Sequence, residues 1–575
     1  MKDTDSRLDS IRHSLAHVLA MAVLKKFPDA KLGIGPTIEH GFYYDFLLPA
    51  PLSDADLPEL EATMREIISQ KLGFTGEPVT QDQASAMFQS QPFKLELLNE
   101  FSKEGKQLTA YHTGTFTDLC RGGHIENTSE INPSAFKLTK VAGAYWRGSE
   151  KNPQLTRIYG AAFETPEELE KHLVMIAEAE KRDHRKLGKE LKLFTISPEV
   201  GPGLPLFYPK GAILRRTIEE YIIRKQEALG YVPIVIPHVT RGELYNISGH
   251  LSKYDALFPP MHLDDEEYYV KPMNCPHFMM LYKSEPHSYR DLPLRYTATT
   301  MVYRNEKSGE LSGLTRVRSI TQDDCHVFCT EDQVPQELET MIGMISEVYR
   351  DFGFDDFYIR LSFRDPKDTS KYIGSDELWA MAEGALTDIV KKHGLKHEIG
   401  LGEAAFYGPK IDYMVKDALG REWQLSTIQL DVNLPERFGL EYTDAEGTKK
   451  RPIVLHRAVT GSTERFMGIL IEHYAGAFPY WLAPVQVAIL PVNDKVADYC
   501  ADIEKRLKDL KIRVETNTDN ETIGKKIRST EMQKIPYMIV VGEKEKAAGN
   551  VSVRAHGGKD LGQLTLDDFI ATAGK

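Results

Sequence analysis

The sequence predicts a multidomain protein built from α+β and α/β domains. Its 575 residues exceed the length at which a single hydrophobic core stops growing. Strand-like and helix-like runs are mixed through most of the chain, whereas they alternate regularly after Pro484, as in βαβ units. With 41% hydrophobic and 27% charged residues, the composition is that of an ordinary globular protein.

The composition also excludes several classes of protein. No apolar run approaches the ~20 residues that a membrane span requires, and residues 1–10 lack the basic start and apolar stretch of a secretory signal. We therefore expect a cytoplasmic protein with no membrane partner. Five cysteines form no disulfide framework and indicate reduced thiols, some of them metal ligands. The net charge of −13 argues mildly against a general nucleic-acid binder.

Residues 1–163 are predicted to form one α+β domain, with a short helix over Ile11–Phe27 and β-like runs such as Gln107–Thr117. The charged stretch 164–193 favours a long exposed helix that links domains, and Pro166 suits its first turn. A solvated helix face accounts for its alternating charges without any function.

Two pairs of residues in the N-terminal domain share one spacing. His13 and His17 are four apart on the predicted helix and so lie on one face. Cys120 and His124 repeat this spacing in DLCRGGHI. Two histidines on a helix are commonly surface or core residues, but the repeated spacing favours a functional site.

This combination resembles the editing domain that threonyl- and alanyl-tRNA synthetases share. The resemblance implies hydrolysis of tRNA that carries the wrong amino acid, and Lys94 and Asp118 match further residues of the editing pocket. Standalone editing enzymes of the alanyl kind bind zinc through such a set, so a second metal is an alternative. We favour the metal-free version, in which the histidines activate water.

The segment 194–482 is predicted to be a mixed α+β core with three features that suit one active site. Arg304-Asn305-Glu306 follows the strand-like TATTMVY, and an arginine there can hold a phosphate. Arg465 lies at the start of the helix-like run after GSTERF, and Pro237 lies in the extended YVPIVIPHVT. Singly, each motif is weak, because an exposed Arg-x-Glu is commonly a surface ion pair.

Together these features resemble the three signature motifs of class II aminoacyl-tRNA synthetases, whose catalytic core is an antiparallel sheet that binds ATP with Mg²⁺. The resemblance places Arg304 and Glu306 at ATP, with Arg304 on the α-phosphate. Arg316 and Arg465 approach the γ-phosphate, and Arg465 also stacks on adenine. Gln424 completes the ATP-binding set. The motif around Pro237 forms a subunit interface in such enzymes, which implies a homodimer.

Cys275, His326 and His456 form a candidate metal set. They offer one thiolate and two imidazoles, each beside strand-like residues. Three protein ligands leave a fourth position of Zn²⁺ open, as in a working rather than a structural site. The wide spacing is not a zinc-finger signature, and a buried cysteine with two satisfied histidines is the alternative.

Within class II, this set and its flanking words resemble threonyl-tRNA synthetases, from RHSLAHVLA through KPMNCPH, TQDDCH, YGPKIDY and LHRAVTGSTERF to KIPYMIVVG. The implied activity joins L-threonine to tRNA(Thr) with ATP and hydrolyses mischarged seryl-tRNA(Thr), using one zinc ion per subunit. Valine is nearly isosteric with threonine, so shape alone discriminates poorly. Asp324 would take the substrate ammonium. The residues that would line the substrate and adenylate pocket are Gln322, Tyr407, Lys410, Gln429 and Ser462.

Two departures from the family pattern stand out. Ile320 occupies the position where bacterial members carry an aromatic residue against adenine, so adenine is expected to rest on an aliphatic surface. The chain also begins directly at the editing module, without the small N-terminal TGS-type domain of many bacterial members.

The segment 483–575 resembles the α/β anticodon-binding domain of several class II synthetases. Lys525, Lys526, Arg528 and Lys534 are candidates for phosphate contacts, although a solvated helix face explains the same charges. By residue match, Asn520, Glu545 and Arg554 are candidates for reading anticodon bases.

Three other functions remain open on the sequence alone. The first is another class II synthetase, such as one for proline or serine. The set Cys275, His326 and His456, together with the editing module, argues against it. A non-catalytic paralogue that binds RNA would not need Arg304 and Arg465. A hydrolase that mainly deacylates tRNA would show no amino-acid-dependent exchange of pyrophosphate into ATP.

Overall fold

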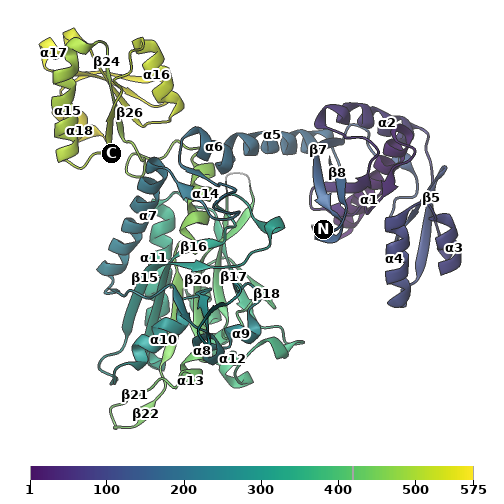
Figure 1. Ribbon diagram of the computed structural model, residues 1–575, viewed down its shortest axis with the longest axis horizontal. Helices are drawn as coiled ribbons and strands as arrows, with labels where there is room; N and C mark the ends of the chain where they lie inside the picture. Colours follow the sequence, from purple (N-terminus) through teal and green to yellow (C-terminus); the bar gives the residue numbers. More distant parts are fainter. Residues whose placement is uncertain (1, 150, 418–419, 574–575) are drawn as a thin grey trace. The chain divides into compact units, whose positions relative to one another are not determined.

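The computed structural model describes residues 2–149, 151–417 and 420–573, with the backbone alone over 2–6. The chain divides into two compact units, Met1–Ala177 and Glu178–Lys575 (Figure 1). Each unit has its own hydrophobic core. The finer division into four domains stays a prediction.

The N-terminal unit is the expected α+β fold. One sheet has the strand order β1-β3-β8-β7, with β2 paired to β3, and a second has the order β4-β5-β6. Helix α1 contributes a continuous row of fully buried residues that pack with α2 on the first sheet. The strands are β1 Lys31–Leu32, β2 Thr37–Ile38, β3 Gly41–Leu47, β4 Phe74–Val79, β5 Leu108–Thr113, β6 Phe116–Leu119, β7 Phe136–Tyr145 and β8 Gln154–Ala162. The helices are α1 Lys2–Lys26, α2 Leu57–Ser69, α3 Gln81–Met87 and α4 Pro92–Lys103.

The single exposed helix expected over 164–193 is wrong, because the segment forms two helices, α5 Pro166–Arg182 and α6 His184–Glu190. Asp183 lies between the two helices, and its ψ of 118° is not helical. Its side chain caps α6 by accepting a hydrogen bond from the backbone N–H of Arg185. In α6 the residues His184, Leu187 and Gly188 are buried.

The segment expected to be the catalytic core contains an eight-stranded sheet of order β11-β15-β16-β23-β20-β19-β17-β18. All neighbours are antiparallel except β11 with β15 and β17 with β18. The antiparallel core expected for a class II synthetase is therefore confirmed. The strands are β11 Val232–Pro233, β15 Leu294–Tyr303, β16 Ser319–Cys329, β17 Phe357–Phe363, β18 His397–Leu401, β19 Lys410–Lys416, β20 Glu422–Asp431 and β23 Ile453–Ala458.

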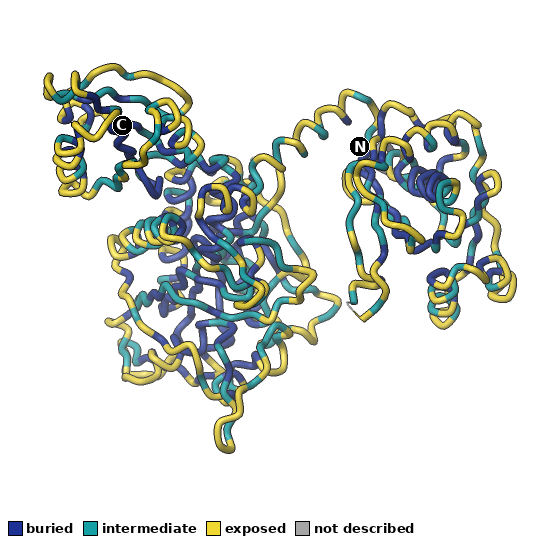
Figure 2. Tube along the Cα trace, turned by 45° about the horizontal axis from the view of Figure 1, so that its top comes forward, coloured by how far each residue is buried: buried dark blue, intermediate teal, exposed yellow. Residues whose placement is uncertain are grey.

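Helices cover one face of this sheet. Residues from α7, α11, α12 and α14 share a single buried cluster with the sheet strands. In Figure 2 the buried segments gather in the interior of this unit and the exposed ones on its outside. The helices are α7 Pro209–Ala228, α8 Gly242–Ser248, α9 His250–Lys253, α10 Cys275–Lys283, α11 Val334–Asp351, α12 Asp376–Lys392, α13 Leu434–Arg437 and α14 Thr463–His473. The small strands are β9 Phe194–Thr195, β10 Leu206–Phe207, β12 Val239–Arg241, β13 Met261–Leu263, β14 Glu266–Val270, β21 Tyr442–Thr443 and β22 Lys449–Lys450.

The C-terminal segment is the expected α/β domain, with a sheet of order β25-β24-β26-β27-β28. Alternate residues of β24 face opposite layers: Val487 and Ile489 pack with α15 and α18, whereas Ala488 and Leu490 pack with α16. The elements are β24 Val487–Pro491, α15 Ala497–Asp509, β25 Val514–Thr516, α16 Ile523–Met532, β26 Tyr537–Val541, α17 Glu543–Ala548, β27 Val551–Ala555, β28 Lys559–Leu564 and α18 Leu566–Thr572.

Candidate active sites

Strand register brings the candidate zinc ligands together. His326 on β16 pairs directly with His456 on β23, and Cys275 is the first residue of α10. All three are buried, and one ligand atom from each lies within 4.8 Å of the others. That spacing leaves room for one ion with Zn–S and Zn–N bonds of about 2.3 and 2.1 Å.

The hydrogen bonding of this set also fits a metal. Among the described residues, neither ring nitrogen of His326 has a hydrogen-bond partner, although the side chain is fully buried. Burial lowers the pKa of His326 well below its usual range, so the imidazole is neutral. A buried neutral imidazole without a partner is costly unless something binds it.

Asp431, at the end of β20, is a residue that sequence reasoning missed. Its Oδ2 lies 2.9 Å from Nε2 of His456, and its Oδ1 accepts hydrogen bonds from the backbone N–H groups of Asn433 and Leu434. A carboxylate that fixes a ligating histidine in this way is typical of metal sites. The signal in the sequence was an acidic residue at a strand end, which is too common to single out.

The expected substrate residues lie on the same face of the sheet. Lys410, Gln429, His456 and His326 follow one another across β19, β20, β23 and β16 as directly paired residues, and paired side chains share a face. Gln322 and Asp324 precede His326 at alternate positions on β16 and therefore share this face as well.

Asp324 is positioned by a neighbour that the sequence did not reveal. Its Oδ2 accepts a hydrogen bond of 2.9 Å from the amide of Asn274, the residue before α10. Burial raises the pKa of Asp324 to about 6, so the group is ionised at neutral pH. Tyr407 completes this region, with its hydroxyl 3.8 Å from the sulfur of Cys275.

The candidate ATP residues lie at the ends of β15 and β16 and at the start of α14. Glu306 accepts hydrogen bonds of 3.0 and 2.9 Å from Arg316. The Nε of Arg465 donates to the carbonyl of Thr315 and its Nη1 to that of Gln424. Burial lowers the pKa of Arg465, and the positive charges of Arg304 and Arg316 lower it further. This concentration of positive charge is suited to a polyphosphate.

Two further side chains shape this end of the site. Ser462 caps α14 by accepting a hydrogen bond from the backbone N–H of Arg465. Ile320 lies on the same face of β16 as Gln322 and packs with Val302 and Val317. An aliphatic rather than an aromatic surface is therefore present where adenine is expected.

A cavity of about 690 Å³ is lined by His13, His17, Lys94, Asp118 and Cys120, and His124 contacts Cys120. Cys120 Sγ lies 3.3 Å from Nε2 of His13 and from Nε2 of His124. Asp118 lies 2.5 Å from the Nζ of Lys94 and 3.6 Å from Nε2 of His17. The spacing pattern therefore identified residues that meet in space.

Burial controls the charges in this cavity. It lowers the pKa of His13, lowers that of His17 well below the usual range and brings that of His124 to about 2. It raises the pKa of Cys120 to about 11. Without a metal, the histidines are neutral and the thiol is protonated. Tyr44, which sequence reasoning missed, donates a hydrogen bond of 2.6 Å to Asp118.

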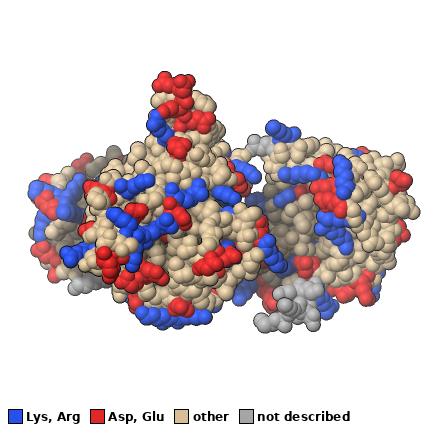
Figure 3. Space-filling model, turned by 90° about the horizontal axis from the view of Figure 1, so that it is seen from below, with Lys and Arg blue, Asp and Glu red and all other residues tan. Residues whose placement is uncertain are grey.

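The C-terminal candidates are only partly as expected. Lys526 is buried and its Nζ donates to the carbonyls of Pro491 and Asn517, so the expected phosphate contact from this lysine is wrong. Asn520 is exposed in the loop before α16. The carboxylate of Glu545 caps its own helix at Gly542. Acidic and basic side chains are mixed over the face drawn in Figure 3.

Three segments of the chain match models of known families. Residues 260–474 match the tRNA synthetase class II core domain (G, H, P, S and T). Residues 486–575 match the anticodon binding domain. Residues 108–159 match the threonyl and alanyl tRNA synthetase second additional domain. None of the helices in the described part of the chain has the length and apolar character of a membrane span.

Curated relatives match nearly the whole chain. The threonine–tRNA ligase of Gloeobacter violaceus is 50% identical over 98% of this chain and 92% of its own length. That of Thermus thermophilus is 48% identical over 98% of this chain and 87% of its own length.

Solved structures are also similar. A structure of the RNA binding domain of threonyl-tRNA synthetase from Cryptosporidium parvum is 36% identical with a TM-score of 0.65, over 68% of this chain and 98% of its own. A Giardia lamblia prolyl-tRNA synthetase, at 18% identity and a TM-score of 0.54, over 68% of this chain and 76% of its own, shares the fold.

Proposed function

The chain belongs to the threonine–tRNA ligase family, and we propose that its catalytic core selects threonine through a zinc ion held by Cys275, His326 and His456. The observation that carries this proposal is that the buried imidazole of His326, which lies beside a thiol and a second imidazole, has no hydrogen-bond partner among the residues that the structure describes. A hydrophobic pocket distinguishes threonine from valine poorly, because the two side chains have nearly one shape. When bound, Zn²⁺ supplies a Lewis-acidic centre for the amino and hydroxyl groups of threonine, which valine cannot match.

The threonine would lie on the face of the sheet that carries the candidate zinc ligands His326 and His456. Asp324 is ionised at neutral pH and can accept a hydrogen bond from the substrate ammonium. The remaining contacts of the substrate and adenylate would come from Gln322, Tyr407, Lys410, Gln429 and Ser462. These side chains exclude water and orient the carboxylate toward the α-phosphate.

Activation with ATP is chiefly a matter of position and charge. Arg304 would contact the α-phosphate, and Arg316 and Arg465 would contact the γ-phosphate. Glu306 holds Arg316 in place, and Mg²⁺ would neutralise the remaining charge of ATP. As the carboxylate attacks the α-phosphorus, these groups stabilise the negative charge that passes to the leaving pyrophosphate.

The second additional domain brings the editing of mischarged tRNA, and we place that reaction in the N-terminal cavity. Serine also carries an amino and a hydroxyl group, and one missing methyl is worth only ~1–3 kcal/mol. Neutral His13 and His17 can accept hydrogen bonds from a water molecule and so orient it for attack. Lys94 and Asp118 form a buried ion pair in the same cavity. We favour a metal-free reaction at this site. Cys120 and His124 would take part in it as polar groups beside His13.

The domain boundaries, the anticodon contacts and the homodimer are proposed from membership of the same family. We assign 1–163 to editing, 164–193 to the linker, 194–482 to catalysis and 483–575 to anticodon binding. Asn520, Glu545 and Arg554 remain candidates for the anticodon. We also propose a cytoplasmic homodimer through the Pro237 region, where Val235 is 99% exposed, as an apolar interface residue would be in a free subunit.

The test is amino-acid-dependent exchange of pyrophosphate into ATP, measured with threonine, serine and valine before and after zinc is removed by a chelator. We expect exchange with threonine and weaker exchange with serine, lost on chelation and restored by Zn²⁺. Exchange that survives complete loss of zinc would refute the metal-based selection. No exchange with any amino acid would instead favour a non-catalytic paralogue.

A further inference from the structure

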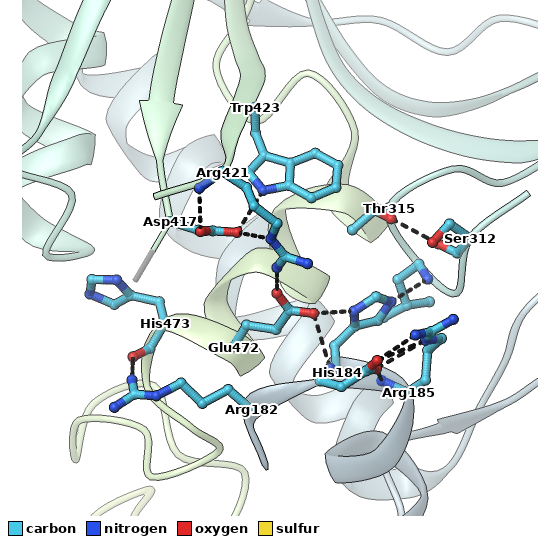
Figure 4. A network of polar contacts seen from close by, with 12 residues as sticks. Arg182, His184, Arg185, Ser312, Thr315, Asp417, Arg421, Trp423, Glu472 and His473 are labelled. Atoms are coloured by element: carbon cyan, nitrogen blue, oxygen red, sulfur yellow. Dashed lines mark hydrogen bonds and ion pairs between the residues drawn. The ribbon is translucent and has the colours of Figure 1, made fainter. Parts of the chain in front are cut away.

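His184 joins the start of α6 to the loop between β15 and β16. It is the first residue of α6 and only 3% exposed. Its Nδ1 lies 2.7 Å from Oε1 of Glu472, near the end of α14, and its backbone N–H donates to the same oxygen. Its Nε2 accepts a hydrogen bond of 3.0 Å from the backbone N–H of Leu314 (Figure 4).

These contacts fix the tautomer of the ring. A backbone N–H can only donate, so Nε2 of His184 carries no proton and the ring proton lies on Nδ1, facing Glu472. The other carboxylate oxygen of Glu472 accepts from Arg421, which is paired at 2.7 Å with Asp417. The ring is therefore held on both sides, with its acceptor directed at Leu314.

Leu314 belongs to the loop that carries the candidate ATP-binding arginines. It is fully buried, and the carbonyl of Thr315, the next residue, accepts the 3.0 Å hydrogen bond from Arg465. Arg316 follows directly. On the other side, Gly313 has φ of +48°, and a Cβ there would lie 2.1 Å from Nε2 of His184. The loop backbone thus closes tightly on the ring.

We propose that His184 is a positioning residue for ATP, which sets the backbone of the 313–316 loop through its hydrogen bond to Leu314. The proposal rests on the proposed function and deepens it. His184 touches no reacting atom in this arrangement. It orders the loop from which Arg316 extends and to which Arg465 is bound, so its loss loosens two of the three arginines assigned to ATP.

Two variants separate the two hydrogen bonds of the ring. His184→Asn keeps a donor near the Nδ1 position for Glu472 but removes the acceptor for Leu314. His184→Gln keeps an acceptor near the Nε2 position. The control pair is His473→Asn and His473→Gln, because this neighbouring histidine packs on Phe354 away from the loop.

We expect His184→Asn to raise KM for ATP in threonine-dependent exchange about tenfold, because a buried N–H loses its acceptor. KM for threonine should change by less than about twofold, since the residues assigned to threonine lie outside this loop. His184→Gln should recover most of the ATP affinity. Hydrogen exchange at Leu314 should accelerate in the Asn variant and much less in the Gln variant. The His473 pair should behave like the parent chain.

The opposite pattern would overturn the inference. If both His184 variants lower kcat in proportion to the folded fraction, with both KM values unchanged, the histidine has a structural role only. Equal effects of Asn and Gln would also exclude the acceptor as the cause. Should the parent chain catalyse no exchange, the proposed function fails and this inference with it, whereas an active parent with unaffected variants fails the inference alone.

Discussion

At the scale of single residues, the strongest argument for a metal is that His326 is buried and that neither of its ring nitrogens has a hydrogen-bond partner in the part of the chain that the structure describes. Oδ1 of Asp324 lies 3.6 Å from its Nδ1, beyond hydrogen-bonding distance. A group of this kind destabilises the fold by about 1–3 kcal/mol unless it is bound. His456, in contrast, is already held by Asp431. One candidate ligand thus has a supporting carboxylate, and the other has no hydrogen bond that an ion would have to displace. This combination is expected of a preorganised metal site.

Substitution of Cys275 tests the ligand set directly. We expect Cys275→Ser to lower the bound zinc from about one ion per chain to well below that, measured by elemental analysis of the purified protein. Cys500→Ser is the matched control, because Cys500 is a buried cysteine of α15 in the C-terminal domain. Equal zinc in both variants would contradict the assignment.

The buried histidines of the N-terminal cavity predict a pH effect on stability. The pKa of His124 is lowered to about 2 and that of His17 well below 6.5, in both cases chiefly by burial. Below pH ~6.5 the unfolded chain therefore binds more protons than the folded one. The free energy of unfolding therefore keeps its full value above about pH 6.5. Below this pH it falls by about 1.4 kcal/mol per histidine for each unit of pH.

Hydrogen exchange in the whole chain checks this prediction. Protection of the α1 amides, corrected for the intrinsic rate, should fall between about pH 7.5 and about pH 5. The amides of β24 and β26, far from these histidines in the sequence, serve as the internal reference. Unchanged protection of α1 over this range would mean that the histidines are not held neutral.

At the scale of elements, the sequence predicted the strands and helices that carry motifs better than it predicted how they meet. The sequence motifs identified His326 on β16 and His456 on β23 as site residues. Only the strand register shows that the two residues are directly paired. Register depends on packing and hydrogen bonds between distant segments, which a single sequence does not contain.

The two wrong predictions have causes that lie outside the local sequence pattern. The linker was read as one helix because 164–193 favours helix throughout, yet Asp183 takes an extended conformation and caps a new helix. Lys526 was read as exposed because lysines usually are. In α16 it lies on the face against the sheet, where two carbonyls accept its hydrogen bonds. In both cases tertiary contacts override the local preference.

The turn into α14 depends on a glycine. Gly461 has φ of +66°, and a Cβ there would lie 2.1 Å from the carbonyl oxygen of Leu425. We expect Gly461→Ala to lower the free energy of unfolding by more than ~1 kcal/mol and to reduce exchange activity, because Arg465 follows this turn. Gly384→Ala in α12 is the control, since its Cβ would meet nothing within 4 Å. It should be neutral or stabilise by up to ~1 kcal/mol. Thermal unfolding of the two variants measures the difference, and equal midpoints would contradict the argument.

At the scale of the whole molecule, selection of the amino acid is divided between two compact units. The catalytic core lies in Glu178–Lys575 and the editing cavity in Met1–Ala177. In the proposed function, the zinc site would reject valine, which lacks a hydroxyl group, but would not strongly reject serine. The editing cavity would remove the serine that passes. A variant of one site should therefore leave the specificity of the other unchanged.

The most direct measurement is the accumulation of aminoacyl-tRNA(Thr) with threonine, serine and valine, each supplied separately to the parent chain and to the Asp118→Asn variant. We predict that the parent accumulates only threonyl-tRNA, and that the variant accumulates threonyl- and seryl-tRNA but no valyl-tRNA. Accumulation of valyl-tRNA by the variant would contradict the assignment of valine rejection to the zinc site. Absence of seryl-tRNA from the variant would contradict the editing role of the N-terminal cavity.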